Sequence, residues 1–234
     1  MSNRENLFRP VHKGIRSMIY ELGDRLQTTD FANVMESNAI ATQLKHDLSD
    51  TVSNCLLCLL HAHSKHEERD IFSAVRPLDP DVIDLQMVEH GEVVRRIFGV
   101  TKTCDELLGL TDRARRIEVG DRLNLEANEL FAFYLAHLNN EEATVVPVMW
   151  EHFTDEQLRA MRAKFYASVP LPRFEEWMRW TLPALNLNEL LVLLSGMKND
   201  PPPSRFADVV RLAERTLDPE RWTAVKTRLD LSTP

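Results

Sequence analysis

The feature that most constrains this chain is a short pattern of histidines and glutamates that occurs twice. Residues 61–72 read HAHSKHEERDIF and place three histidines and three carboxylates within ten residues. His63 and Glu67 are four residues apart, so on a helix they project from one face at neighbouring turns. Residues 137–147 repeat the order His-x-x-x-Glu-Glu, starting with His137 and Glu141. An imidazole and a carboxylate at this spacing can bind one metal ion.

Four long segments with helical periodicity carry this pattern. Apolar residues recur at helical spacing over about 10–26, 33–75, 80–108 and 111–152. Pro10 suits a first helical turn, Asp79 before Pro80 is typical of a helix cap and start, and Pro147 predicts a kink. Because the breaks between the segments are short, we expect an all-α fold, specifically an up-down-up-down four-helix bundle.

The third and fourth segments each predict a buried face. In the third segment the expected apolar positions are Val82, Leu85, Val88, Val93, Ile97 and Leu107, and in the fourth they are Leu123, Leu130, Phe131, Tyr134, Leu138, Val145 and Val148. His12 and His90 lie in the first and third segments, each with a glycine within two residues. This likeness indicates a duplicated helix hairpin, which would bring two single histidines and two His-x-x-x-Glu pairs into the bundle core.

The chain is expected to divide near residue 153. Residues 1–153 hold the four segments, and Thr154 and Gln157 form a capping-box pattern that opens a helix to about residue 168. Prolines then divide the rest into short helices at about 172–182, 187–198, 204–216 and 218–229. Because residues 154–234 show no titratable cluster, we interpret them as a helical extension that caps the bundle or binds a partner.

Composition excludes several classes of partner. The net charge is −8 and no block of Lys or Arg is present, so nucleic acid and anionic membrane are poor partners. No apolar run approaches the roughly 18 residues that a membrane span needs. The N-terminus is polar, and three cysteines are compatible with a reducing compartment. A cytoplasmic protein is expected.

Other metal-binding patterns fit less well. None of the eight histidines has a glutamate three residues before it, as the ferritin-like Glu-x-x-His motif requires. The zinc-protease motif is also absent, because Asp70 stands where its second histidine would be. His66 and Asp70 form a rival pair at the same spacing, but the matching positions in the second repeat are Asn140 and Thr144.

The order His, His-x-x-x-Glu, His, His-x-x-x-Glu resembles the hemerythrin-like (HHE cation-binding) family over about residues 8–152. The resemblance implies a four-helix bundle that binds a pair of non-haem irons bridged by oxo or hydroxo groups, with other divalent metals as an alternative. It also implies reaction with, or sensing of, oxygen, peroxide or nitric oxide. The ligands that it implies are His12, His63, Glu67, His90, His137 and Glu141.

The sequence departs from the oxygen-carrying hemerythrins at two positions. They have a second histidine one turn after the third-helix histidine, where this chain has Val94, and they use an aspartate five residues after the last histidine, where it has Glu142. Val94 predicts an open coordination position, and therefore peroxide consumption rather than reversible oxygen binding. His66, Glu68, Glu142 and Tyr134 are candidates for supporting roles beside the ligands.

Three hypotheses follow, and in the third of them the site of the bundle has been repurposed for zinc or is structural only. In the first, the protein reacts with a small diatomic ligand or peroxide at two irons, and whether it is an enzyme is open. In the second, the metal site is an iron-level sensor or a metal-dependent interaction module without turnover, and a protein partner binds through the C-terminal helices.

Overall fold

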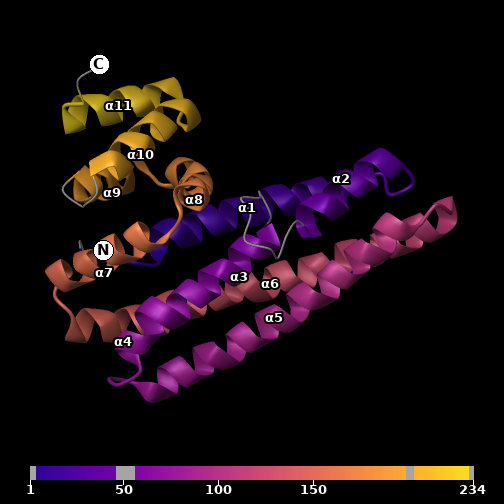
Figure 1. The fold of residues 1–234 in the computed structure, drawn as a ribbon, viewed down its shortest axis with the longest axis horizontal. Coiled ribbons are helices and arrows are strands. Elements are labelled where there is room, and N and C mark those ends of the chain that lie inside the picture. Colours follow the sequence, from indigo (N-terminus) through magenta and orange to yellow (C-terminus); the bar gives the residue numbers. More distant parts are fainter. Residues whose placement is uncertain (1–3, 46–55, 199–202, 232–234) are drawn as a thin grey trace. The chain divides into compact units, whose positions relative to one another are not determined.

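The computed structural model describes residues 4–45, 56–198 and 203–231, and all regular structure in these ranges is helical (Figure 1). Contacts divide the chain into two compact units, one of Met18–Val148 and one of Met1–Ser17 with Met149–Pro234. The helices are α1 (Arg9–Thr28), α2 (Val34–Lys45), α3 (Leu56–His66), the π-helix η1 (Glu67–Phe72), α4 (Ser73–Val75), α5 (Pro80–Gly109), α6 (Arg113–His152), α7 (Asp155–Ser168), α8 (Leu171–Ala184), α9 (Leu187–Lys198), α10 (Pro203–Thr216) and α11 (Pro219–Leu229).

Three of the four long segments form helices close to their predicted bounds. These are α1, α5 and α6, and α5 begins as predicted, with Pro80 in its first turn and the side chain of Asp79 accepting a hydrogen bond from the Val82 N–H. The second segment was expected as one helix over 33–75. It contains α2, α3, η1 and α4, and residues 46–55 within it lie outside the described ranges. The π-helix was not expected.

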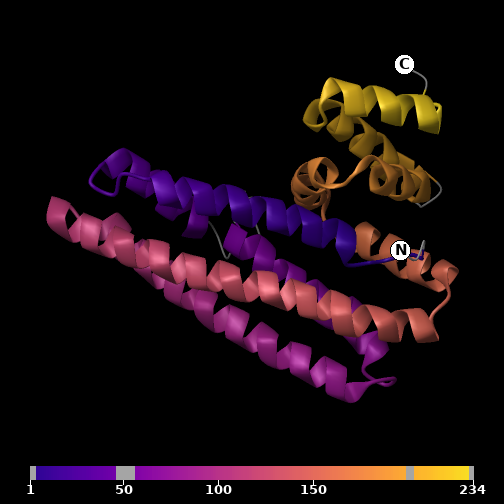
Figure 2. The same ribbon diagram turned by 180° about the vertical axis from the view of Figure 1, so that it is seen from behind.

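The Met18–Val148 unit is built on α5 and α6, which run side by side in both ribbon views (Figures 1 and 2). Thr103 of α5 donates a hydrogen bond to Glu126 of α6 at 2.6 Å, and Gln86 donates one to Thr144 at 3.1 Å. The buried side chains of α6 confirm six of the seven positions of the predicted face, whereas Val148 is only half-buried. The six are Leu123, Leu130, Phe131, Tyr134, Leu138 and Val145.

The predicted buried face of α5 is partly wrong. Leu85 is 50% exposed and Val88 is 71% exposed, whereas Val93, Ile97 and Leu107 are buried as expected. The buried positions of its first half are instead Ile83, Gln86, His90 and Val93. The helix is therefore rotated relative to the apolar pattern, because two of the residues that face the core are polar.

A buried arginine joins three helices at the start of α6. The Arg116 guanidinium is 1% exposed and donates hydrogen bonds to the carbonyls of Leu107 and Leu110, beside the end of α5. It also donates to the Ser37 hydroxyl and to Oδ1 of Asn38, both on α2. Its charge is thus shared among several oxygens, as a buried cation requires.

The second unit combines the N-terminal residues with α7 to α11. The predicted capping box is present, since the Thr154 hydroxyl accepts from Gln157 N–H and the Gln157 side chain accepts from Thr154 N–H. The Lys13 ammonium pairs with Glu189 of α9 at 2.6 Å. Gly14 approaches Thr181 of α8 so closely that an added Cβ would lie 2.8 Å from the hydroxyl. The expected division into residues 1–153 and 154–234 stays a prediction.

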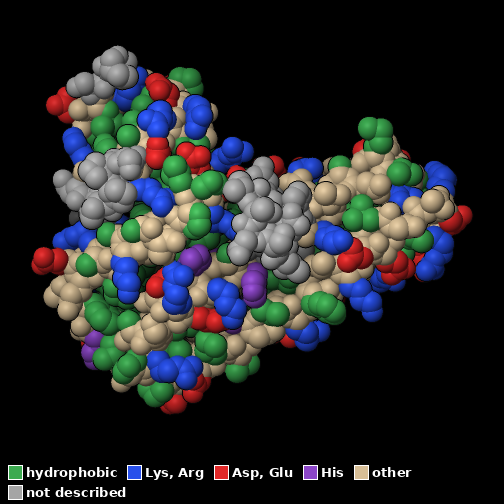
Figure 3. Space-filling model, in the orientation of Figure 1, with side chains coloured by type: hydrophobic (Ala, Val, Ile, Leu, Met, Phe, Trp, Pro, Cys, Tyr) green, Lys and Arg blue, Asp and Glu red, His purple; other side chains and the backbone are tan. Residues whose placement is uncertain are grey.

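On the face in Figure 3, Lys and Arg side chains are interspersed with Asp and Glu. Among the described residues, Arg122 pairs with Glu106 and lies 3.7 Å from Glu126, and Arg96 pairs with Glu92 at 2.7 Å. Within the described residues, no helix combines the length and apolar character that crossing a membrane requires.

Candidate metal centre

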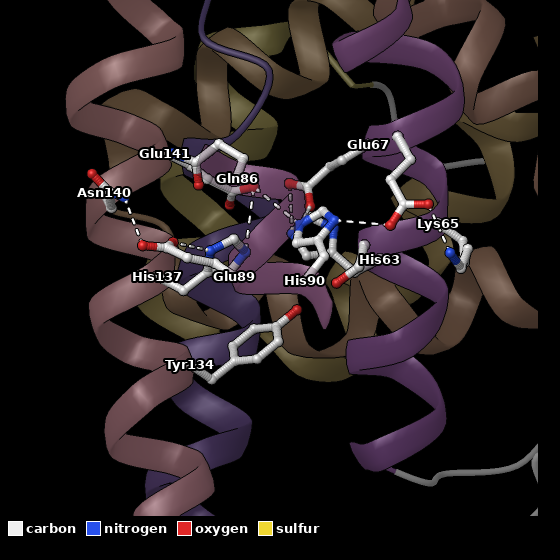
Figure 4. A network of polar contacts seen from close by, with 12 residues as sticks. His63, Lys65, Glu67, Gln86, Glu89, His90, Tyr134, His137, Asn140 and Glu141 are labelled. Atoms are coloured by element: carbon white, nitrogen blue, oxygen red, sulfur yellow. Dashed lines mark hydrogen bonds and ion pairs between the residues drawn. The ribbon is translucent and has the colours of Figure 1, made fainter. Parts of the chain in front are cut away.

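Five of the six predicted ligands meet inside the Met18–Val148 unit (Figure 4). His63 comes from the end of α3 and Glu67 from the start of η1, while α5 contributes His90 and α6 contributes His137 and Glu141. Each of these side chains is at most 3% exposed. The helical register therefore brings two buried carboxylates and three buried imidazoles together from four elements of the unit.

These five residues form two overlapping groups of donors. Ligand atoms of His63, Glu67 and Glu141 all lie within 4.8 Å of one another. The same holds for a set of four, made up of Glu67, His90, His137 and Glu141. Both groups contain Glu67 and Glu141, so these two carboxylates would be shared if an ion were bound in each group.

The donor separations are close to those around a metal ion, two of them being slightly longer. Nε2 of His63 lies 3.0 Å from Oε1 of Glu67, and Nε2 of His90 lies 3.6 Å from Oε2 of Glu67. Oε1 of Glu141 lies 3.5 Å from Nε2 of His90 and 3.4 Å from Nε2 of His137. Two ligand atoms that bind one ion at about 2.1 Å are about 3.0–3.4 Å apart. The residues therefore fit a shared ion.

His90 and His137 direct Nε2 toward Glu67 and Glu141, because the other ring nitrogen of each, Nδ1, lies beside a different carboxylate. Nδ1 of His90 lies 3.0 Å from Oε1 of Glu68, and Nδ1 of His137 lies 2.7 Å from Oε2 of Glu89. Within the described chain, Nε2 of His90 and of His137 is buried and makes no hydrogen bond. A carboxylate behind a histidine is the usual arrangement for a metal-binding imidazole.

The π-helix explains how two consecutive glutamates contact one imidazole. Glu67 and Glu68 both lie near His90, at Nε2 and Nδ1 respectively. A π-helix turns about 80° per residue rather than the roughly 100° of an α-helix, so adjacent side chains diverge less. Short π-helices inside α-helices are frequent at functional sites. Here the turn begins at a predicted ligand, Glu67.

Aromatic rings surround the second group. Phe72 stacks on His90 with a centroid separation of 5.1 Å and an interplanar angle of 24°. Tyr134 meets the edge of His137 at 5.7 Å, and its hydroxyl donates a hydrogen bond to the Leu60 carbonyl at 3.3 Å. Burial, together with Glu67 and Glu141, raises the pKa of Tyr134 well above its usual value, so the phenol keeps its proton.

The two neighbouring histidines differ in protonation. Burial lowers the pKa of His90, but Glu141 and Glu67 oppose this and raise it overall to about 10. Burial lowers the pKa of His137 to about 4, against the opposing effect of Glu67. Their ring centroids are 4.9 Å apart, and two like charges this close in a buried site disfavour each other. Without metal, therefore, His90 carries the proton and His137 is neutral.

The remaining predicted residues are placed as follows. His12 lies on α1 in the other unit, where it is buried against Phe8, so its assignment as a ligand stays a prediction. His66 is partly buried, with Nδ1 2.9 Å from the Arg69 guanidinium and 3.9 Å from Asp70. Glu142 is partly buried.

Val94 lies outside the buried face of α5. Val94 is 41% exposed, while Val93, the preceding residue, is fully buried on the face of α5 that carries His90. In an α-helix, the residues three and four positions after a given residue lie on either side of it on the helix surface. Here Val93, three positions after His90, faces the core, and Val94 lies on the other side. Val94 therefore does not line the centre, and the expected open coordination position and peroxide consumption stay predictions.

Sequence reasoning missed two polar residues of α5 beside the centre, Glu89 and Gln86. Glu89 accepts from His137, and its other oxygen accepts from the Asn140 amide at 2.9 Å. Gln86 is buried one turn before His90, and its amide donates to Thr144. The sequence carried a signal for Gln86 alone, since a glutamine four residues before a candidate ligand shares its helix face.

Comparison of the chain with protein-family models, with curated proteins and with solved structures gave no match.

Proposed function

We propose that this chain is a metal-binding protein of the hemerythrin type, with a four-helix bundle that holds two irons and reacts with or senses oxygen, peroxide or nitric oxide. One observation carries the proposal: the two donor groups share Glu67 and Glu141. Two ions in such sites are typically about 3.5–4 Å apart. Supporting it, the sequence pattern assigns His12 as a further ligand.

The chemistry of the donors favours particular metals. Imidazole nitrogens and carboxylate oxygens, without thiolate, suit iron, manganese or zinc. The described part of the site contains no cysteine, since the buried Cys104 lies on α5 more than three turns beyond His90. Two irons, when bound, would supply redox chemistry and coordination positions for small ligands. The protein's own part is to hold the donors in a buried site and to orient the histidines.

Reactivity is tested by loading the protein with Fe²⁺ without oxygen and recording its optical spectrum as oxygen, peroxide or nitric oxide is added. We expect a spectral change with at least one of them and peroxide consumption faster than that of an equal amount of unbound iron. Glu67→Ala is the matched control, because it removes a shared ligand. If two irons are bound and none of the three ligands changes the spectrum, the reactivity part of the proposal is wrong.

A second candidate function, metal-dependent control of a protein partner, is favoured by the unit that contains His12. The residues that follow His12 contact the C-terminal helices. Lys13 forms an ion pair with Glu189 of α9, and Gly14 packs against Thr181 of α8. Metal binding at His12 would therefore act on residues that pack against α8 and α9. Hydrogen exchange of those helices should slow when iron is added to the wild type and not when it is added to His12→Ala. Equal exchange with and without iron would contradict this second function.

A further inference from the structure

Glu89 of α5 is bound to α6 through both of its carboxylate oxygens (Figure 4). Oε2 lies 2.7 Å from Nδ1 of His137, and Oε1 accepts a hydrogen bond from the Asn140 amide at 2.9 Å. His137 and Asn140 are three residues apart on α6, whereas Glu89 lies on α5 immediately before His90. Two donors from one helix therefore hold this carboxylate in one orientation.

The contact dictates which nitrogen of His137 carries a proton. A carboxylate can only accept, so at 2.7 Å the nitrogen opposite Glu89 has to be an N–H. In a neutral imidazole the other nitrogen then has a lone pair, and Nε2 of His137 is the atom that lies 3.4 Å from Oε1 of Glu141. The lone pair therefore faces the donor group that Glu67, His90 and Glu141 complete.

We propose that Glu89 is a positioning residue for the metal centre: by accepting the Nδ1 proton of His137 it keeps Nε2 free to bind the ion. This inference rests on the proposed metal-binding function. Without Glu89, the carboxylate that remains beside His137 is Glu141, at Nε2. The proton would then favour Nε2, the nitrogen that has to coordinate, and each binding event would first have to move it.

If Glu89 only linked α5 to α6, its replacement would have the same effect as replacing another residue that links these helices. The Glu89 contacts also join α5 to α6, so losing them removes a link between the helices. Glu126 offers a matched control, because it joins the same two helices through the Thr103 hydroxyl at 2.6 Å. Glu126 contacts Thr103 and Arg122 rather than the histidines. Glu89→Ala and Glu126→Ala thus make the same chemical change on the same helix pair.

The experiment measures tautomer and affinity separately. The ¹⁵N chemical shifts of the His137 ring, in metal-free protein labelled at histidine, report which nitrogen is protonated. Competition with a chromophoric chelator gives the affinity for Co²⁺. We expect an Nδ1–H ring in the wild type and in Glu126→Ala, and an Nε2–H ring in Glu89→Ala. Loss of a carboxylate behind a ligating histidine typically costs about 10–100-fold in metal affinity, and we expect that loss in Glu89→Ala only.

Each other outcome is informative. An Nε2–H ring in the wild type overturns the proposal without any variant, so the test survives if Glu89→Ala does not fold. Equal loss of Co²⁺ affinity in Glu89→Ala and Glu126→Ala would show that Glu89 is only a link between helices. If the wild type has the Nδ1–H ring but binds no Co²⁺, the proposed metal function fails while the assignment of the tautomer stands.

Discussion

At the scale of single residues, the centre depends most on Glu67 and Glu141. Both carboxylates are at most 2% exposed, and each belongs to both donor groups. A buried carboxylate is stable only when cations or hydrogen-bond donors compensate its charge. A pair of divalent ions would do so, which is why these two residues are the sharpest targets for substitution.

Replacing Glu67 should abolish binding at both positions. Glu67→Ala removes a donor from each group, so we expect metal content to fall from two ions per chain to none by elemental analysis. Glu68→Ala is the neighbouring control. It removes the contact with Nδ1 of His90 but no shared donor, so the affinity should weaken and two ions should still bind at saturation. Full occupancy in Glu67→Ala would contradict the bridging assignment.

Metal affinity should rise with pH. The pKa of His90 is raised to about 10 without metal, so at neutral pH this imidazole is protonated and has to lose its proton before it can bind an ion. Release of one proton makes the apparent affinity increase about tenfold per pH unit between pH 6 and 8. Calorimetry in buffers of different ionisation enthalpy measures this release. A binding constant that does not change over this range would show that His90 is not a ligand.

Sequence spacing predicted the candidate ligands of the centre but not the residues that hydrogen-bond to those ligands. His63, Glu67, His137 and Glu141 follow from i,i+4 spacing on helices. Glu89 was missed because its partners are on another helix, and adjacent positions in a sequence do not show which residues meet across helices. His90 and Val94 illustrate the same limit, since spacing alone did not tell which face of α5 is buried.

At the scale of elements, the apolar pattern of the sequence did not predict the π-helix, nor which face of α5 is buried. The periodicity predicted a regular helix through residue 75, but a wider turn at Glu67–Phe72 lets Glu67, Glu68 and Phe72 all contact His90. On α5 the apolar residues Leu85 and Val88 stay exposed. The polar Gln86 and His90 take the buried positions, because the centre needs donors where a core would otherwise have leucine.

Phe72, the last residue of the π-helix, tests this element. It is 2% exposed and stacks on His90, so Phe72→Ala should lower the free energy of unfolding of the metal-free protein by about 3–5 kcal/mol. Phe98→Ala on α5 is the control, because Phe98 is 72% exposed and its loss should change stability by no more than about 0.5 kcal/mol. Urea unfolding gives both values. Similar losses in the two variants would mean that η1 is not packed as described.

At the scale of the whole molecule, the proposed metal binding would be coupled to folding. The donors come together only in the folded chain, so ions that bind the folded state raise its stability. At a hundredfold excess of free metal over the dissociation constant, one site contributes about 2.7 kcal/mol. For a chain of this size, each kcal/mol raises the melting temperature by about 2–4 °C.

Removing metal should therefore lower the melting temperature by several degrees, as a thermal scan with and without chelator would show. Glu67→Ala should melt at the same temperature in both conditions, because it lacks the shared ligand. If chelation leaves the wild-type melting temperature unchanged while metal is lost, the donors are not organised by the ion and the centre is not formed as described.

The central claim is that Glu67 and Glu141 hold two ions between them, and metal content tests it most directly. The wild-type protein is loaded with Fe²⁺ without oxygen, separated from unbound iron, and analysed for iron and protein in the same sample. The account predicts two irons per chain, together with two Co²⁺ per chain when cobalt is used instead. One ion or none per chain after loading would contradict it.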